Sequence, residues 1–331
     1  MTIERLLSKQ EREKKMLIAT LPALHRTDLL EKIISDPAVS AVRYNTGAVL
    51  SYSVRETLQL LKNMTEFYSK SLWIDLKGRQ LRIMHWAVPD YAKIVLNHKI
   101  EVEGSARVYF RGDQFSELKL ARGNVIYVDP PPRTAVGEGQ SINILGENVR
   151  ILGYLTGRDK EFLRVSGDLG ITDFCLSFVE GWEDIREAEK VFAENPNVKP
   201  DVHAKFYLKI ESPKGFDFAA GLSSDAVKRY RIIAARDDLL VTLGGNKPAM
   251  LSMLENFVTI NPAAIVASRL FSGLENGGAV TFADYTDLEL MRRFGYKNFM
   301  LSDGICGRHF SEAIKAWKEF FTHTKSAERR L

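Results

Sequence analysis

The sequence predicts an α/β fold, an eight-stranded (β/α)8 TIM barrel with a small β domain inserted after the third strand. Eight short runs of β-branched and aromatic residues recur along the chain, each followed by a helical pattern, as in a buried parallel sheet. The number of runs and their regular spacing favour a closed barrel over an open doubly wound sheet. The runs are residues 16–20, 41–45, 72–75, 174–178, 206–211, 232–236, 264–268 and 299–302.

Amphipathic helices are predicted between these runs. In residues 27–35, for example, Leu29, Leu30, Ile33 and Ile34 recur at helical spacing and define one apolar face. A stop signal, Asn195-Pro196, follows the helix predicted in the middle of the chain. The predicted helices are residues 27–35, 54–68, 183–194, 249–258, 288–294 and 312–321.

The gap between the third and fourth runs predicts the inserted domain. It holds roughly 70 residues more than a βαβ unit of ~30 residues requires. Residues 99–103 and 106–110 alternate polar and apolar side chains, as half-exposed antiparallel strands do, and residues 124–128 form a further strand-like run. We therefore expect a small lid-like β domain at residues 84–151, and a barrel domain at residues 1–83 and 152–331.

Composition excludes several classes of protein. The 331-residue chain has 46 basic and 42 acidic residues mixed along its length, which does not predict a nucleic-acid partner. Two cysteines cannot form a disulfide framework or a cysteine-rich metal site. No apolar run approaches the ~20 residues of a membrane span, and the start of the chain lacks a signal core. We expect a cytoplasmic protein with no membrane partner, and the sequence leaves a homo-oligomer open.

Polar residues gather where the predicted strands end, the face on which barrel active sites lie. Glu211 and Asp238 could share a divalent cation such as Mg²⁺ through hard carboxylate oxygens. Lys209 faces the same side as Glu211 and can stabilise negative charge, while Arg43 offers a planar fork for phosphate or carboxylate. A lone charge at a strand end is more often a rim ion pair. The interpretation rests on several such residues together: Arg43, Asn45, Asp75, Lys77, Ser177, Lys209, Glu211, Arg236, Asp238, Ser268 and Ser302.

These strand ends resemble the motifs of the pyruvate kinase family. Residues 209–215, Lys-Ile-Glu-Ser-Pro-Lys-Gly, are similar to its Lys-Ile-Glu-Asn-x-x-Gly, and residues 235–239, Ala-Arg-Asp-Asp-Leu, to its Ala-Arg-Gly-Asp-Leu. Residues 75–82 are similar to Asp-x-Lys-Gly-Pro-Glu-Ile-Arg. Shorter matches at residues 20–23, 43–45, 176–179, 267–269 and 300–302 follow in family order, one per strand. The resemblance extends from about Met16 to Phe321.

The resemblance implies metal-dependent phosphoryl transfer between a phosphoenolpyruvate-type substrate and ADP or ATP. It implies Mg²⁺ or Mn²⁺ on Glu211 and Asp238, and K⁺ near Asn45 and Asp75. Lys209 would stabilise the transferring phosphoryl group. The remaining roles it suggests are phosphate contact by Arg43, enolate protonation by Ser268 (where the family has a threonine), and contacts with a pyruvate-like substrate by Ser177, Arg236, Asp237 and Lys77.

Four departures from the family pattern leave other functions open. Residues 43–47, Arg-Tyr-Asn-Thr-Gly, lack the serine and histidine of the family's Arg-x-Asn-Phe-Ser-His-Gly. Asp237 replaces a glycine whose backbone approaches the substrate carboxylate, and residues 302–305 replace Ser-Gly-Glu-Thr. The chain ends after the last barrel helix, so the family's C-terminal regulatory domain is not expected. The alternatives are aldolase- or lyase-like enolate chemistry on a 2-oxo acid without nucleotide, or a non-catalytic metabolite-binding barrel.

Overall fold

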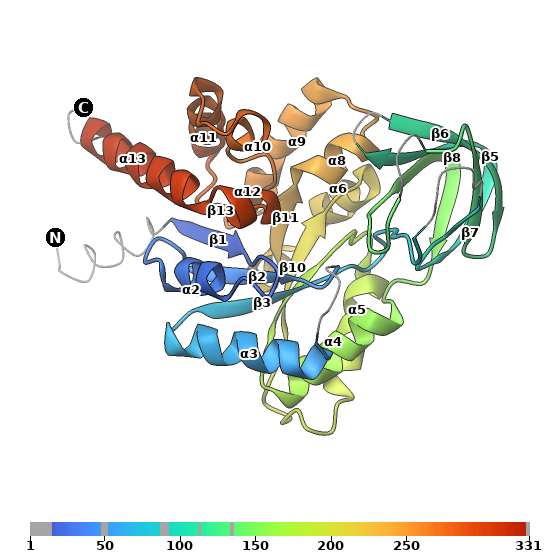
Figure 1. Ribbon diagram of the computed structural model, residues 1–331, viewed down its shortest axis with the longest axis horizontal. Coiled ribbons are helices and arrows are strands. Elements are labelled where there is room, and N and C mark those ends of the chain that lie inside the picture. The colour runs from blue at the N-terminus through green and yellow to red at the C-terminus, as the bar shows by residue number, and fades with distance from the viewer. Residues whose placement is uncertain (1–14, 48–51, 87–92, 112–113, 133–135, 329–331) are drawn as a thin grey trace.

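The computed structural model describes residues 15–47, 52–86, 93–111, 114–132 and 136–328. It contains a closed barrel of eight parallel strands in the order β1-β13-β12-β11-β10-β9-β3-β2, with helices around it (Figure 1), which confirms the predicted fold. Residues 1–14 and 329–331 of the predicted barrel domain lie outside the described residues. The barrel strands are β1 (Met16–Thr20), β2 (Ala41–Asn45), β3 (Ser71–Leu76), β9 (Asp173–Leu176), β10 (Lys205–Ile210), β11 (Arg231–Ala235), β12 (Ile265–Ala267) and β13 (Asn298–Leu301).

Helices cover the outside of the barrel and bury an apolar face against it. In α2, Leu30, Ile33 and Ile34 are buried, as their spacing predicts. A capping box between Ser53 and Glu56 fixes the start of α3. The helices are α2 (Thr27–Ser35), α3 (Val54–Phe67), α4 (Gly157–Asp168), α5 (Trp182–Ala193), α6 (Pro213–Ala220), α7 (Ser224–Arg229), α8 (Arg236–Thr242), α9 (Lys247–Ile260), α10 (Ser272–Gly277), α11 (Phe282–Phe294), α12 (Asp303–Arg308) and α13 (Phe310–Glu328).

A packed floor fills the barrel below the strand ends. Trp73 and Tyr207 stack there with ring centroids 3.8 Å apart, within a cluster of buried residues that includes Cys175. Side chains two residues apart on a strand share a face, so Asp75 follows Trp73 into the interior and Lys209 follows Tyr207. The floor therefore supports the charged side chains at the mouth.

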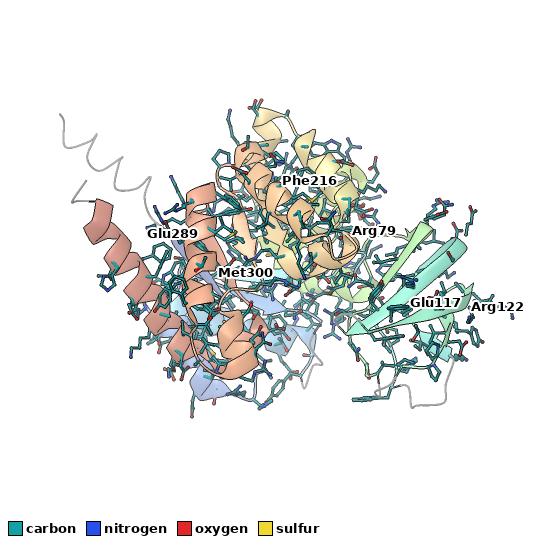
Figure 2. The ribbon with its side chains drawn as sticks, turned by 90° about the horizontal axis from the view of Figure 1, so that it is seen from above. Arg79, Glu117, Arg122, Phe216, Glu289 and Met300 are labelled. Carbon is teal, nitrogen blue, oxygen red and sulfur yellow. The ribbon has the colours of Figure 1, made fainter. Side chains whose placement is uncertain are left out.

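A five-stranded antiparallel sheet projects from one side of the barrel and has an apolar core of its own. Figure 2 shows it from above, with Glu117 and Arg122 on the sheet, Met300 on barrel strand β13 and Phe216 on helix α6. The limits 84–151 of the predicted domain remain a prediction, and residues 87–92, 112–113 and 133–135 lie outside the described residues. The strand order is β4-β7-β6-β5-β8, formed by β4 (Lys93–Val95), β5 (Lys99–Arg111), β6 (Gln114–Arg122), β7 (Val125–Asp129) and β8 (Asn143–Leu152).

The prediction of two separate strands at residues 99–103 and 106–110 is wrong, because both belong to β5. Gly104, with φ of +82°, lies where the pairing with β8 shifts register between Glu103 and Ala106. A glycine at positive φ is equally typical of a bulge and of a turn. Here it forms the bulge.

Close packing fixes the point where the chain leaves the barrel for the sheet. Gly78 has a φ of +48°, and a Cβ there would lie 2.5 Å from the carbonyl oxygen of Ser177. The His98 ring contacts the Gly78 carbonyl through Nε2 at 2.7 Å and the Leu152 carbonyl through Nδ1 at 3.3 Å. One imidazole thus joins both ends of the connection.

Among the described residues, no helix is long and apolar enough to cross a membrane.

Candidate active site

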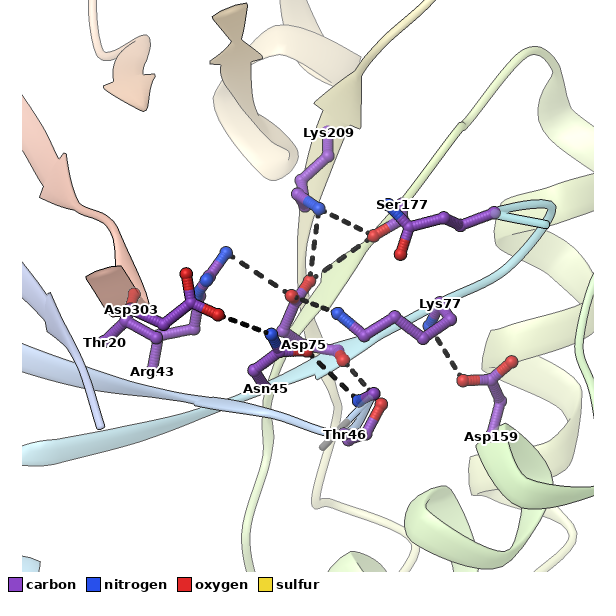
Figure 3. Close-up of polar contacts among 12 residues, drawn as sticks. Thr20, Arg43, Asn45, Thr46, Asp75, Lys77, Asp159, Ser177, Lys209 and Asp303 are labelled. Atoms are coloured by element: carbon purple, nitrogen blue, oxygen red, sulfur yellow. Dashed lines mark hydrogen bonds and ion pairs between the residues drawn. The ribbon is translucent and has the colours of Figure 1, made fainter. Parts of the chain in front are cut away.

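Asp75, at the end of β3, lies at the centre of a buried ion cluster (Figure 3). Its Oδ2 is 2.6 Å from Lys77 Nζ and 3.3 Å from an Arg43 guanidinium nitrogen, and its Oδ1 is 3.5 Å from Lys209 Nζ. Burial alone would raise the pKa of Asp75, but these three cations lower it below its usual value. Asp75 is therefore ionised at all ordinary pH values and fixes the cations around it.

Lys209 connects this cluster to Glu211. Its ammonium donates a hydrogen bond of 2.7 Å to Ser177 Oγ and lies 2.9 Å from Glu211 Oε1. Burial opposes the charged form of Lys209, yet Asp75 and Glu211 raise its pKa above the ordinary value. The ammonium remains protonated at the mouth of the barrel, where it can stabilise negative charge.

Glu211 is fully buried and has an unsatisfied oxygen. The Phe178 N–H donates to Oε2 at 2.7 Å, whereas Oε1 has no hydrogen-bond partner despite its proximity to Lys209. Burial raises the pKa of Glu211 to about 7, and the negative charge of Asp238 contributes in the same direction. A buried carboxylate next to a second carboxylate is an arrangement that a bound cation would stabilise.

Asp238, in the first turn of α8, faces the space between the barrel and the inserted sheet. Its oxygens accept long amide hydrogen bonds from Gln80 at 3.3 Å and Asn143 at 3.5 Å. The space is a cleft of about 640 Å³, within the size range of small-ligand sites. The barrel and the sheet both contribute to its lining of Asn45, Gly47, Arg82, Tyr109, Phe110, Gly139, Gln140, Ser141, Asn143, Asp237, Asp238, Val241, Arg269 and Asp303.

Three charged residues of the cleft, Arg82, Arg269 and Asp303, were missed by the sequence interpretation. Asp303, at the start of α12, accepts a hydrogen bond of 3.1 Å from the Asn45 amide. Arg269, after β12, lies 2.8 Å from Asp237 through its Nε. Asp303 lies in the stretch 302–305 that departs from the family pattern, which was the available signal, but a departure alone does not reveal a partner.

Arg236 is not among the residues that line the cleft, and its role in substrate binding stays a prediction. Its buried guanidinium makes two hydrogen bonds to Asp287 of α11, at 2.6 and 3.0 Å. It also donates to the carbonyl oxygen of Ser268. These contacts make Arg236 a positioning residue for the loop after β12. The structure gives the Ser268 hydroxyl no described partner, but its backbone adopts a left-handed φ of 66°.

Comparison with known proteins finds chains of similar sequence and a structure of similar fold. The chain is 23% identical over 324 residues to a pyruvate kinase of Borreliella burgdorferi, and 26% identical over 333 residues to one of Thermoplasma acidophilum. These matches cover 90% and 92% of the chain. The fold matches a crystal structure of Cryptosporidium parvum pyruvate kinase with a TM-score of 0.72 and 16% identity, over 93% of this chain and 70% of that one. No protein-family model matches.

The chain is pyruvate kinase-like. It spans 66% and 57% of the lengths of the two curated relatives, which is less than two thirds of each. The resemblance predicted from the strand-end motifs is thereby confirmed. The activity, substrates and cofactors of whole pyruvate kinases remain proposals for this chain.

Glu211 and Asp238 fit a divalent cation in a pyruvate kinase-like site. Glu211 Oε1 is a buried acceptor whose described contact is the Lys209 ammonium at 2.9 Å, and Asp238 accepts two long amide bonds. Among the described residues, no group of three or more His, Cys, Asp or Glu side chains is arranged to hold a metal. Two carboxylates suffice for Mg²⁺ when substrate and water complete its coordination.

A monovalent cation fits the predicted ligands Asn45 and Asp75 poorly. The Asp75 carboxylate is surrounded by three cationic side chains, which would repel a further cation. Asn45 Oδ1 accepts the Gly47 N–H at 3.1 Å, and its amide nitrogen donates to Asp303. Asn45 and Asp75 therefore do not fit a K⁺ site.

Proposed function

We propose that the cleft transfers a phosphoryl group between a phosphoenolpyruvate-type substrate and a nucleotide, with Mg²⁺ or Mn²⁺ held by Glu211 and Asp238. The observation that carries the proposal is the position of Lys209. Its ammonium is held by Ser177 and Asp75 and lies against the unsatisfied oxygen of Glu211. Sequence similarity to curated pyruvate kinases supports the same class of reaction.

Lys209 and Arg43 would neutralise the transferring group. Phosphoryl transfer depends mainly on positioning and on stabilising the charge of the phosphoryl oxygens. The raised pKa of Lys209 keeps its ammonium charged. Arg43 has a buried Nε without a hydrogen-bond partner, which leaves a donor for an anionic oxygen. A bound divalent cation would polarise the phosphoryl and enolate oxygens.

The reaction requires the phosphorus–oxygen bond of the enol phosphate to break and the enolate carbon to gain a proton. We assign proton delivery to the Ser268 hydroxyl, whose left-handed backbone is a conformation that often marks functional sites. Lys77 and Ser177 belong to the inner ion cluster and would hold the substrate's position through it.

The inserted sheet supports the proposal because it forms the other wall of the cleft. Tyr109, Phe110, Gln140 and Asn143 face the barrel residues across it. A nucleotide bound between these walls would displace water from the transferring group, which strengthens each electrostatic contact there.

The test is formation of pyruvate and ATP from phosphoenolpyruvate and ADP with Mg²⁺ or Mn²⁺. We expect activity in the wild type, its loss in Glu211→Gln and Asp238→Asn, and no loss in the control Asp225→Asn, whose side chain is 91% exposed on α7. Absence of product from the wild type with either metal contradicts the proposal. Metal-dependent exchange of the pyruvate methyl protons without nucleotide would then indicate enolate chemistry alone.

A further inference from the structure

Asp237 and Arg269 form an ion pair on the barrel wall of the cleft. They follow the neighbouring strands β11 and β12, and Arg269 Nε lies 2.8 Å from Asp237 Oδ1. Both side chains line the cleft and are about half exposed, at 47% for Arg269 and 58% for Asp237. Arg269 contacts Asp237 through Nε, and among the described residues no hydrogen bond is seen from the other two guanidinium nitrogens.

The backbone fixes the direction of Arg269. Ser268 and Arg269 have left-handed φ values of 66° and 57°, which are unfavourable for residues other than glycine. The buried Arg236, itself paired with Asp287, holds the Ser268 carbonyl and stabilises this conformation. The loop is thus held in an unfavourable conformation by a buried network, as is common where a side chain is aimed at a ligand.

The two arginines of the cleft differ in what they can bind. The Arg82 guanidinium is engaged by the carbonyls of Gly47 and Gly139 and by the Gln80 side chain. Of the described residues that line the cleft, Arg269 therefore presents the guanidinium with the fewest contacts. A planar guanidinium with two accessible nitrogens matches a carboxylate.

We propose that Arg269 determines specificity by binding the substrate carboxylate, and that Asp237 orients it. This assignment rests on the proposed function and deepens it. It removes the apparent conflict of an acidic side chain in a site for an anionic substrate, because the Asp237 charge is neutralised by its partner. The phosphoryl group is left to Lys209, so the two anionic ends of the substrate have separate contacts.

The experiment measures binding of two probes by titration calorimetry with Mg²⁺ present: pyruvate, which has only the carboxylate, and inorganic phosphate. We expect Arg269→Gln to weaken pyruvate binding by about tenfold or more and phosphate binding by less than about twofold. Arg269→Lys should recover little, since an ammonium cannot form the bidentate contact. The matched control is Arg229→Gln, which removes another half-exposed ion pair, to Glu189 on the outside of the barrel.

The outcomes separate this inference from the proposed function. Equal pyruvate binding in Arg269→Gln and Arg229→Gln overturns the inference, even if the wild type transfers phosphoryl groups. Equal weakening of pyruvate and phosphate overturns the assignment to the carboxylate. Selective loss of pyruvate binding supports it, even if the wild type forms no ATP. In an active wild type, Arg269→Gln should raise the KM for phosphoenolpyruvate more than it lowers kcat.

Discussion

The two halves of the candidate site differ in how many contacts their charged side chains make. In the inner cluster of Asp75, Arg43, Lys77, Lys209 and Ser177, the protein's own side chains surround each charge. At the cleft rim, formed by Asp237, Asp238, Arg269 and Asp303, the charges make single or long contacts and line open space.

This difference indicates that the inner cluster is preorganised and that the charges of the cleft rim can still bind a ligand. A buried charge without partners is costly, so the inner cluster must be complete before any ligand binds. Rim charges keep part of their hydration and can exchange it for ligand oxygens or nitrogens. Substitutions in the inner cluster should therefore affect folding as well as turnover, whereas substitutions at the rim should affect mainly binding and turnover.

The largest effect is expected for Asp75→Asn. The change leaves the buried cations Lys77 and Lys209 close together without their shared carboxylate, and breaking a buried pair costs about 3–5 kcal/mol. Urea unfolding should show a loss of that size, compared with almost none for the exposed control Asp225→Asn. A loss below about 1 kcal/mol would mean that the cluster is not the structural half of the site.

Asp238→Asn should have the opposite pair of effects, with little loss of stability and a large loss of activity. Its carboxylate is only half-buried and accepts two long bonds, so the free energy of unfolding should fall by less than about 1 kcal/mol. Steady-state kinetics should show kcat/KM lower by about 100-fold or more, because one of the two carboxylates that we propose as cation ligands is removed. Wild-type kinetics in this variant would place the metal elsewhere.

The pH dependence of stability offers a third test, on Lys77. Burial lowers its pKa to about 8 despite the attraction of Asp75, and the positive charge of Lys209 lowers it further. Between about 8 and the ordinary value of 10.5, the unfolded chain binds the proton that the folded chain has released, so stability rises with pH. Lys77→Arg keeps the charge and does not titrate in this range.

Urea unfolding at pH 7.5 and at pH 10 measures this effect. The wild type should gain about 1–3 kcal/mol relative to Lys77→Arg over the interval. If the unfolding free energies of the wild type and Lys77→Arg differ by the same amount at both pH values, Lys77 has an ordinary pKa.

The smallest effect is expected for Asn143→Ala, which removes the 3.5 Å contact between the inserted sheet and Asp238. Stability should change by less than about 0.5 kcal/mol, since the bond is at the limit of hydrogen-bond length. Asn124→Ala is the matched control, because that amide makes a 3.0 Å bond to the Leu96 carbonyl within the sheet and should cost about 1 kcal/mol. A larger loss for Asn143→Ala than for this control would show that the sheet depends on Asp238.

The barrel was predictable from the sequence because each of its strands is marked by a short run of its own residues. Continuous runs of β-branched and aromatic residues marked each buried strand, and the two-residue spacing of Lys209 and Glu211 predicted that they face the same side. In the structure Lys209 Nζ lies 2.9 Å from Glu211 Oε1. The inserted sheet was harder to predict from the sequence, because a glycine such as Gly104 is equally typical of a turn between two strands and of a bulge within one strand. Strands β6 and β8 were not predicted. Strand β8 pairs with β5, which is distant in sequence, whereas β6 pairs with its chain neighbours β5 and β7.

The rim was the least predictable part of the site. Gln80, Asn143, Arg269 and Asp303 come from four separate segments that meet only when the barrel closes and the sheet folds over it. Asp75 was predicted at the correct strand end as a potassium ligand, but sequence alone does not show that Arg43 and Lys77 reach its carboxylate. Which side chains form ion pairs depends on the directions in which they point from neighbouring strands.

Mn²⁺ binding followed by electron paramagnetic resonance, with phosphoenolpyruvate present, is the most direct test of whether Glu211 and Asp238 hold one cation. We predict binding of about one Mn²⁺ per chain in the wild type, and an affinity lower by about tenfold or more in Glu211→Gln and in Asp238→Asn, with Asp225→Asn unchanged. Undiminished Mn²⁺ binding in both variants would contradict the account.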